Sequence, residues 1–186
     1  EAGATVVADP LTAWLDEDQK FLPGGRLGPE LRRLFGVRGE EFDCPLPSER
    51  LAVEGEGALL PGECSAREIC DILQVEPETE TLARFAEDFY AGRPALTRRQ
   101  QGKGAALYLA ASLDAAALRC LLQGLCSELG LEPPLKGAPV GVQVRQRKVS
   151  AGHAYFFFSN YTNSEKEVDL PDSGWIFEDA LDEATP

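Results

Sequence analysis

Cys64 lies in the segment whose pattern most resembles a nucleophile site. The run Gly62-Glu63-Cys64-Ser65-Ala66 is similar to an elbow, the sharp turn between a strand and a helix that lifts a reactive side chain out of a sheet. A cysteine nucleophile needs a base, and the only histidine, His153, falls in a predicted turn far along the chain. Pro61 is also a poor residue for the end of a central strand. A cysteine-dependent amidotransferase-like enzyme using Cys64 therefore stays an alternative and not the preferred interpretation.

Paired carboxylates are a second feature that could do chemistry, because hydrolytic enzymes use positioned carboxyl groups as acids, bases and nucleophiles. Glu63 with Glu68, and Glu76 with Glu78, are such pairs. The chain holds 31 acidic residues, so chance pairs are numerous, and both pairs lie in polar stretches of sequence. We predict no catalytic residue in this chain.

Three further motifs have simpler explanations as turns and strands. Gly102-Lys103-Gly104 contains residues that can cradle a phosphate, but a P-loop continues into a helix and here an apolar strand follows. Asn160-Tyr161-Thr162 fits a glycosylation sequon and equally an Asn-rich turn. The aromatic run Tyr155–Phe158 could line a sugar-binding face, although alternation sends half of its side chains to the opposite side. We predict no cofactor.

Charge and composition exclude several classes of partner. The 186 residues carry 18 Lys and Arg against 31 Asp and Glu, a net charge of −13, so nucleic acid would bind against the field of the molecule. No apolar run approaches the roughly 18 residues that a membrane helix needs. The five cysteines are odd in number and lack the C-x-x-C spacing of zinc sites. This usage favours reduced thiols, no bound metal and a cytoplasmic protein.

The first part of the chain mixes strands and helices that would position these residues. Residues 4–8 are apolar and β-rich, as in a buried parallel strand. Pro29 is expected to begin a short helix that Gly36 ends. The prolines and glycines between Cys44 and Gly62 argue against long regular structure there.

The middle of the chain is ambiguous until a clear strand and helix follow. Residues 69–75 and 79–89 fit both helical and strand periods. Leu107–Ala111 predict a strand, and a helix follows with Ser112 as its N-cap candidate and Gly130 just past its end. Its apolar face is expected to pack on a sheet and comprises Leu118, Leu121, Leu122, Leu125 and Leu129.

After residue 138 the pattern is that of strands alone. Valines alternate with polar residues over 140–144, an aromatic β-rich run covers 154–159, and an Asn-rich turn leads into a third expected strand at 166–170. This predicts an antiparallel meander. We therefore expect two domains, an α/β domain over 1–137 and a small antiparallel β-domain over 138–186.

Several short blocks run in order from about Gly3 to about Leu129. The longest is Asp88–Thr97, followed by Gly102-Lys103-Gly104 and residues 105–109. The others are Asp16-Glu17-Asp18, Gly24-Gly25, Gly28-Pro29, Leu34–Val37 and Glu41-Phe42-Asp43. Together these blocks resemble the trimerisation domain of family 42 glycoside hydrolases, the bacterial β-galactosidases. The second part of the chain resembles the C-terminal β-domain of the same enzymes, although its pattern is generic.

The resemblance implies a flavodoxin-like, doubly wound domain that lacks its first β/α unit. The chain contains no Met and opens on Glu1-Ala2-Gly3, where the glycine fits the C-cap of a helix. In the family, both catalytic glutamates lie in an upstream (β/α)₈ barrel, so no residue here inherits their role. The resemblance also favours a strand over a helix for residues 69–75. We expect a fragment that is inactive alone.

The role implied for this chain is assembly. Its parent would hydrolyse terminal β-galactosides with retention, binding them in the missing barrel, while this part joins three copies. A homotrimer requires heterologous contacts that close a ring. The alternative is a binding or interaction module of another multidomain protein.

Overall fold

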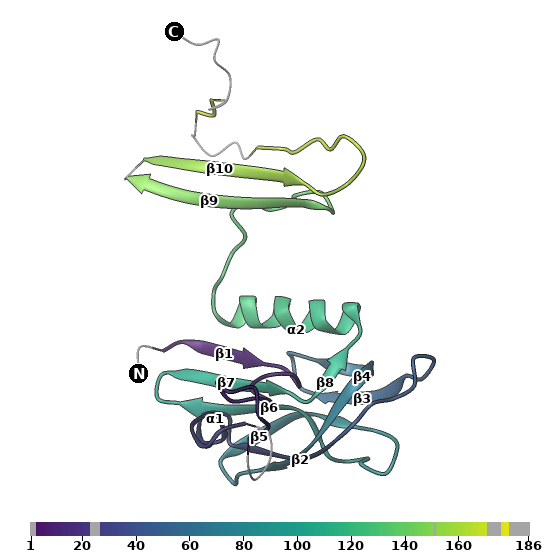
Figure 1. Ribbon diagram of the computed structural model, residues 1–186. Coiled ribbons are helices and arrows are strands. Elements are labelled where there is room, and N and C mark those ends of the chain that lie inside the picture. The colour runs from purple at the N-terminus through teal and green to yellow at the C-terminus, as the bar shows by residue number, and fades with distance from the viewer. Residues whose placement is uncertain (1–2, 23–26, 151, 171–175, 179–186) are drawn as a thin grey trace. The chain divides into compact units, whose positions relative to one another are not determined.

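The computed structural model describes residues 3–22, 27–150, 152–170 and 176–178. The chain divides into two compact units, the sheet unit Glu1–Leu129 and the hairpin unit Gly130–Pro186. Figure 1 shows the elements, which are β1 Thr5–Ala8, α1 Pro29–Phe35, β2 Val37–Asp43, β3 Leu51–Glu56, β4 Pro61–Val75, β5 Thr79–Phe85, β6 Pro94–Gln101, β7 Gly104–Leu109, β8 Ala111–Leu113, α2 Ala115–Glu128, β9 Val142–Ser150 and β10 His153–Asn160.

The sheet unit is built on eight strands in the order β1-β7-β6-β5-β3-β4-β2, with β8 pairing to β4. Only β1 and β7 run parallel among these pairs, and the remaining neighbours are antiparallel. The described residues thus form a mostly antiparallel sheet with few helices, whereas the resemblance implied a doubly wound α/β sheet. Parallel neighbours need a crossover of about a dozen residues or more, whereas β6 and β7 are joined by Gly102 and Lys103 alone.

The ambiguous segments fold as strands. Residues 69–75 belong to β4, as the resemblance predicted, and 79–85 form β5, in which Thr79, Ala83 and Phe85 are buried. The prediction of little regular structure between Cys44 and Gly62 is wrong for β3. Leu51 and Val53 are both buried there, so the period of two prevails over the glycines nearby.

The first helix is as predicted. Pro29 begins α1 and Gly36 ends it in a left-handed conformation with φ of 63°. A β-carbon at Gly36 would collide with the hydroxyl of Thr79, so both conformation and close packing require glycine there. The helix packs against β2, β6 and β7. Its Phe35 ring meets Tyr108 edge to face, with ring centroids 5.7 Å apart.

The second helix begins two residues later than the Ser112 N-cap predicts. Ser112 lies in β8, which pairs with β4, and Asp114 is the N-cap instead, accepting from the amides of Ala116 and Ala117 at 2.9 Å each. These hydrogen bonds, led by that of Ala117 and joined by Ser65, lower the pKa of Asp114. Gly130 follows the helix in a left-handed conformation, as predicted.

The leucine face of α2 is only partly buried. Leu121 and Leu125 point into the core together with Ala117. The leucines at 118, 122 and 129 are 40%, 48% and 46% exposed. The predicted packing on a sheet is correct, but the buried stripe is narrower than the sequence suggested.

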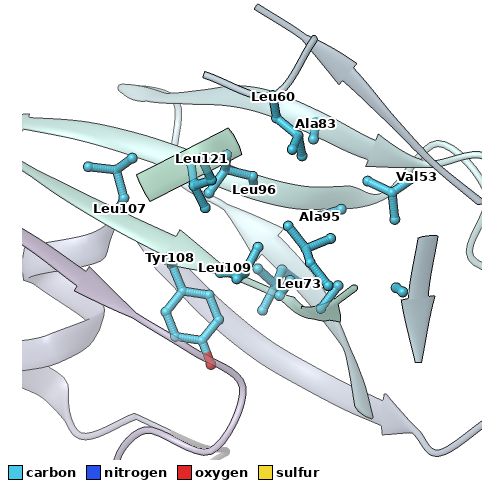
Figure 2. Close-up of a cluster of buried hydrophobic side chains, with 14 of the residues drawn as sticks. Val53, Leu60, Leu73, Ala83, Ala95, Leu96, Leu107, Tyr108, Leu109 and Leu121 are labelled. Carbon is cyan, nitrogen blue, oxygen red and sulfur yellow. The ribbon is translucent and has the colours of Figure 1, made fainter. Parts of the chain in front are cut away.

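The core lies around the central strands. Every residue of β7 is buried, because α1 contacts this strand and α2 lies on the other side of the sheet (Figure 1). Figure 2 shows Leu121 of α2 beside Leu96, while Tyr108 points away from that helix. No helix in the described ranges is long and apolar enough to cross a bilayer.

The hairpin unit contains β9 and β10 in antiparallel register, with Phe157 opposite Arg145 and Tyr155 opposite Arg147. Two of the three predicted strands are therefore present. Residues 166–170 form no strand. Before them, hydrogen bonds among Asn160, Thr162 and Ser164 hold an irregular segment after β10.

Candidate functional site

Cys64 is not a nucleophile elbow. It lies inside the 15-residue strand β4, opposite Val53 of β3, and not at a turn between a strand and a helix. Burial, followed by the nearby charges of Asp114, Cys120 and Glu63, raises the pKa of Cys64 to about 11. A catalytic cysteine needs the opposite shift, because the thiolate is the nucleophile. The amidotransferase-like interpretation is therefore wrong.

The histidine and the paired carboxylates lie in solvent. His153 is exposed beside the β9–β10 turn, with its Nδ1 3.3 Å from the hydroxyl of Ser150, as expected of a surface turn. Glu68 pairs with Arg67 at 3.5 Å. Glu63, Glu68, Glu76 and Glu78 are all exposed, and none has the apolar surroundings that make a carboxyl group a general acid.

The remaining motifs are explained locally. Gly102 adopts φ of 60° in the tight turn between β6 and β7. Asn160 accepts from the amide and hydroxyl of Thr162 at 2.9 and 2.7 Å, so its side chain organises the predicted turn. Within the described residues, no three His, Cys, Asp or Glu side chains gather in a way that could hold a metal ion.

The turn between β5 and β6 is held in shape by hydrogen bonds and ring contacts. It comprises Ala86–Arg93, and its residues from Asp88 onward belong to the longest block of the resemblance. Tyr90 is 2% exposed and anchors the turn, because its hydroxyl donates to Asp43 at 2.9 Å and its ring packs edge to face on Phe85 at 4.9 Å. Burial and the hydrogen bond to Asp43 raise the pKa of Tyr90 above its usual range.

The same turn presents one aromatic ring to solvent. Phe89 is 71% exposed and stands edge to face on Tyr90, with centroids 4.8 Å apart. Asp88 takes a left-handed conformation with φ of 69° and accepts from the amide of Phe89 at 2.6 Å. Gly92 closes the turn through its amide to the carbonyl of Phe85, at 2.7 Å. Aromatic side chains, phenylalanine included, are enriched at protein–protein interfaces.

A second polar link crosses the core nearby. The hydroxyl of Tyr108 donates to the fully buried Asp71 at 2.7 Å, joining β7 to β4. Cys70 also lies in this region, and burial raises its pKa to about 12. Sequence reasoning missed these tyrosine–aspartate pairs, since their partners lie 47 and 37 residues apart and no local pattern connects them.

Comparison with known proteins shows which family this chain is similar to. A family model described as the beta-galactosidase trimerisation domain matches residues 1–132. The β-galactosidase BgaP of Planococcus sp. is 36% identical over 175 residues, which cover 93% of this chain and 25% of that protein. The β-galactosidase BglY of Alicyclobacillus acidocaldarius is 33% identical over 177 residues, with the same coverage of 93% and 25%.

Solved structures of β-galactosidases are also similar to this chain. The β-galactosidase of Bacillus circulans sp. alkalophilus matches with a TM-score of 0.76 at 36% identity, over 85% of this chain and 23% of that one. The cold-adapted β-galactosidase of Rahnella sp. matches with a TM-score of 0.75 at 30% identity, over 86% of this chain and 24% of that one. The fold is that of an assembly domain of multidomain hydrolases. The chain belongs to the β-galactosidase trimerisation domain family, and spans about a quarter of the length of these curated relatives.

Proposed function

We propose that this chain is the non-catalytic assembly part of a retaining β-galactosidase that acts on terminal β-galactosides as a homotrimer. The observation that carries the proposal is the family match over residues 1–132. Relatives named as β-galactosidases are about four times longer than the matched region, so the substrate and the catalytic carboxylates are assigned to the part of those proteins outside it.

The exposed apolar surface supports an assembly role. A monomeric domain usually leaves only scattered apolar side chains in solvent. Here Phe89 projects from its turn, and three leucines of α2 are 40% or more exposed. Three copies around one axis meet through heterologous contacts, in which two different surfaces of the same chain face each other. The proposal therefore needs two complementary surfaces rather than one.

The finer fold assignment is also a proposal. In a flavodoxin-like sheet, β1 would be an interior strand with parallel neighbours on both sides. Its pairing with β7 is parallel, and Val6 and Val7 are 41% and 43% exposed although they point to opposite faces. Because β1 ends the strand order among the described residues, its outer edge can pair with a further strand. Fast amide exchange in β1 of the isolated chain, and slow exchange in a complete β-galactosidase, would support it; equal rates would contradict it.

The boundary between the two domains is also part of the proposal. We place the end of the assembly domain between residues 130 and 137, because the compact sheet unit ends at Leu129 and the family match ends at residue 132. The antiparallel β-domain then begins near residue 138. The five cysteines are free thiols, which fits an assembly in the reducing cytoplasm.

Activity and mass test the proposal together. The purified chain should leave a chromogenic β-galactoside uncleaved, because the proposed acid/base and nucleophile are not among its residues. Light scattering over a concentration series should reveal exchange between one and three copies of the 20.2 kDa chain. Activity that disappears when a glutamate of this chain is replaced, or a stable dimer, would overturn it.

A further inference from the structure

The hairpin unit contains a stretch of charge opposite to the rest of the protein. Between Glu132 and Glu165 the sequence has no acidic residue and four basic ones, Lys136, Arg145, Arg147 and Lys148. The rest of the chain carries the other 14 Lys and Arg against all 31 acidic residues. A cationic segment in so acidic a protein is the natural counterpart of an anionic surface.

The hairpin arranges two of these cations beside two aromatic rings. Arg147 lies opposite Tyr155, and Arg145 lies opposite Phe157, so period-two alternation places all four on one side of the hairpin. Both rings are 53% exposed, with centroids 6.5 Å apart. None of the ion pairs found within the described residues involves either arginine. We call these four residues the basic-aromatic face.

The sheet unit carries a surface of the opposite character. A hollow of about 330 Å³ is lined by Asp43, Glu49, Glu87 and Asp88. We call these four residues the acidic hollow, and Phe89 follows directly on Asp88. The one cation in the lining, Arg50, donates to the carbonyls of Pro47 and Glu49 at 3.1 and 2.6 Å.

The carboxylates of the acidic hollow accept hydrogen bonds from neutral donors. Glu49 accepts from the amide of Leu46 at 2.7 Å, and Glu87 accepts from the amide of Ala52 at 2.6 Å. None of the four carboxylates takes part in an ion pair within the described part of the chain. The hollow is thus held in shape by backbone hydrogen bonds, and its carboxylates outnumber the single guanidinium of Arg50.

We propose that the basic-aromatic face of one copy docks on the acidic hollow of a second copy, with Phe89 packing at the edge of that contact. The inference rests on the proposed trimer and names its two surfaces. Because the surfaces differ, the contact is heterologous, and repetition around a three-fold axis closes a ring. The occupant of each surface is another copy of this chain, since each surface supplies the charge that the other lacks.

The exposure of the hairpin favours the same conclusion. An isolated two-stranded hairpin is marginally stable in water, and no residue of β9 or β10 is buried in this chain. The arginine stems and the two rings provide apolar contact as well as charge. Docking would therefore order the hairpin while it joins the copies.

Charge reversal with an adjacent control tests the proposal. The full chain carrying Arg147→Glu is compared with Lys148→Glu, which makes the same change of charge one residue along β9, on the opposite side of the strand. Sedimentation equilibrium measures the protein concentration at which half of the chains are trimeric. This concentration should rise by about tenfold or more for Arg147→Glu and by less than about twofold for Lys148→Glu. Equal shifts in the two variants would overturn the proposed face.

A swap between the two surfaces completes the test. Glu49→Lys with Glu87→Lys should abolish trimers in the same way as Arg145→Glu with Arg147→Glu, and all four changes in one chain should restore them. Circular dichroism and the melting temperature establish that each variant is folded. Trimers that persist in both double variants would overturn this contact and leave the proposed assembly role intact, whereas a wild-type chain that stays monomeric would overturn both. Altered melting without altered mass would mean a contact within one chain, and would also overturn it.

Discussion

Strands β7 and β10 have the same alternating backbone but opposite surroundings. Every residue of β7 is buried, whereas none of β10 is. Strand β7 has two neighbouring strands and a helix on each side, while β10 has one strand as its partner in the hairpin. The side chains of β7 are thus buried by contacts within the sheet unit, whereas those of β10 stay accessible to solvent.

The largest difference is expected from apolar truncation. Leu107→Ala removes a side chain that is 0% exposed and should lower the free energy of unfolding by about 2 to 5 kcal/mol through lost burial and the cavity left behind. Phe157→Ala removes a larger side chain that is 53% exposed. Its cost in the unassembled chain should stay below about 1 kcal/mol. Urea unfolding measures both, and equal costs would remove the distinction between the units.

Deleting a single hydroxyl should have the next largest effect. Tyr108→Phe deprives the buried Asp71 of a donor at 2.7 Å, which should cost about 1 to 3 kcal/mol. Tyr155→Phe makes the same chemical change on the exposed hairpin face. It should change stability by no more than about 0.5 kcal/mol. If Tyr108→Phe left the free energy of unfolding unchanged, the hydrogen bond between β7 and β4 would contribute nothing to stability.

The smallest effect concerns the N-cap of α2 and depends on pH. Asp114→Ala should cost about 1 kcal/mol at neutral pH. The pKa of Asp114 is lowered in the folded chain, so its contribution is present above the ordinary aspartate pKa of about 3.9 and is lost as pH falls through the lower folded value. Wild type and variant should therefore converge in acid. Asp114→Asn keeps a capping oxygen and should retain most of the stability at neutral pH; an unchanged gap down to the lowest pH would contradict the assignment.

Local rules predicted the parts of this fold that local interactions decide. Pro29 and Gly36 bound α1 because they fix backbone conformation, and alternation placed Tyr155 and Phe157 on one side of β10. Ser112 failed as an N-cap because β8 pairs with β4, a contact between residues about 45 positions apart. The antiparallel sheet was not predicted, because the resemblance implied a doubly wound sheet. The two-residue connection between β6 and β7 fits antiparallel neighbours only.

The candidate site divides in the same way. The block Asp88–Thr97 resembles the family, but no local pattern predicts that Tyr90 is buried and Phe89 exposed, because the hydrogen bond from Tyr90 to Asp43 spans 47 residues. The cationic stretch between Glu132 and Glu165 was readable from the sequence. The acidic residues from Glu165 onward lie in the same unit, so the net charge of the unit does not indicate this stretch.

Native mass spectrometry of the intact chain over a wide concentration range tests the central claim most directly. The claim is that this domain joins three copies through two different surfaces. We expect monomers at low concentration and species of three times the 20.2 kDa chain mass at high concentration, with dimers as a minor intermediate. A chain that remains monomeric at every concentration, or that stops at a dimer, would contradict it.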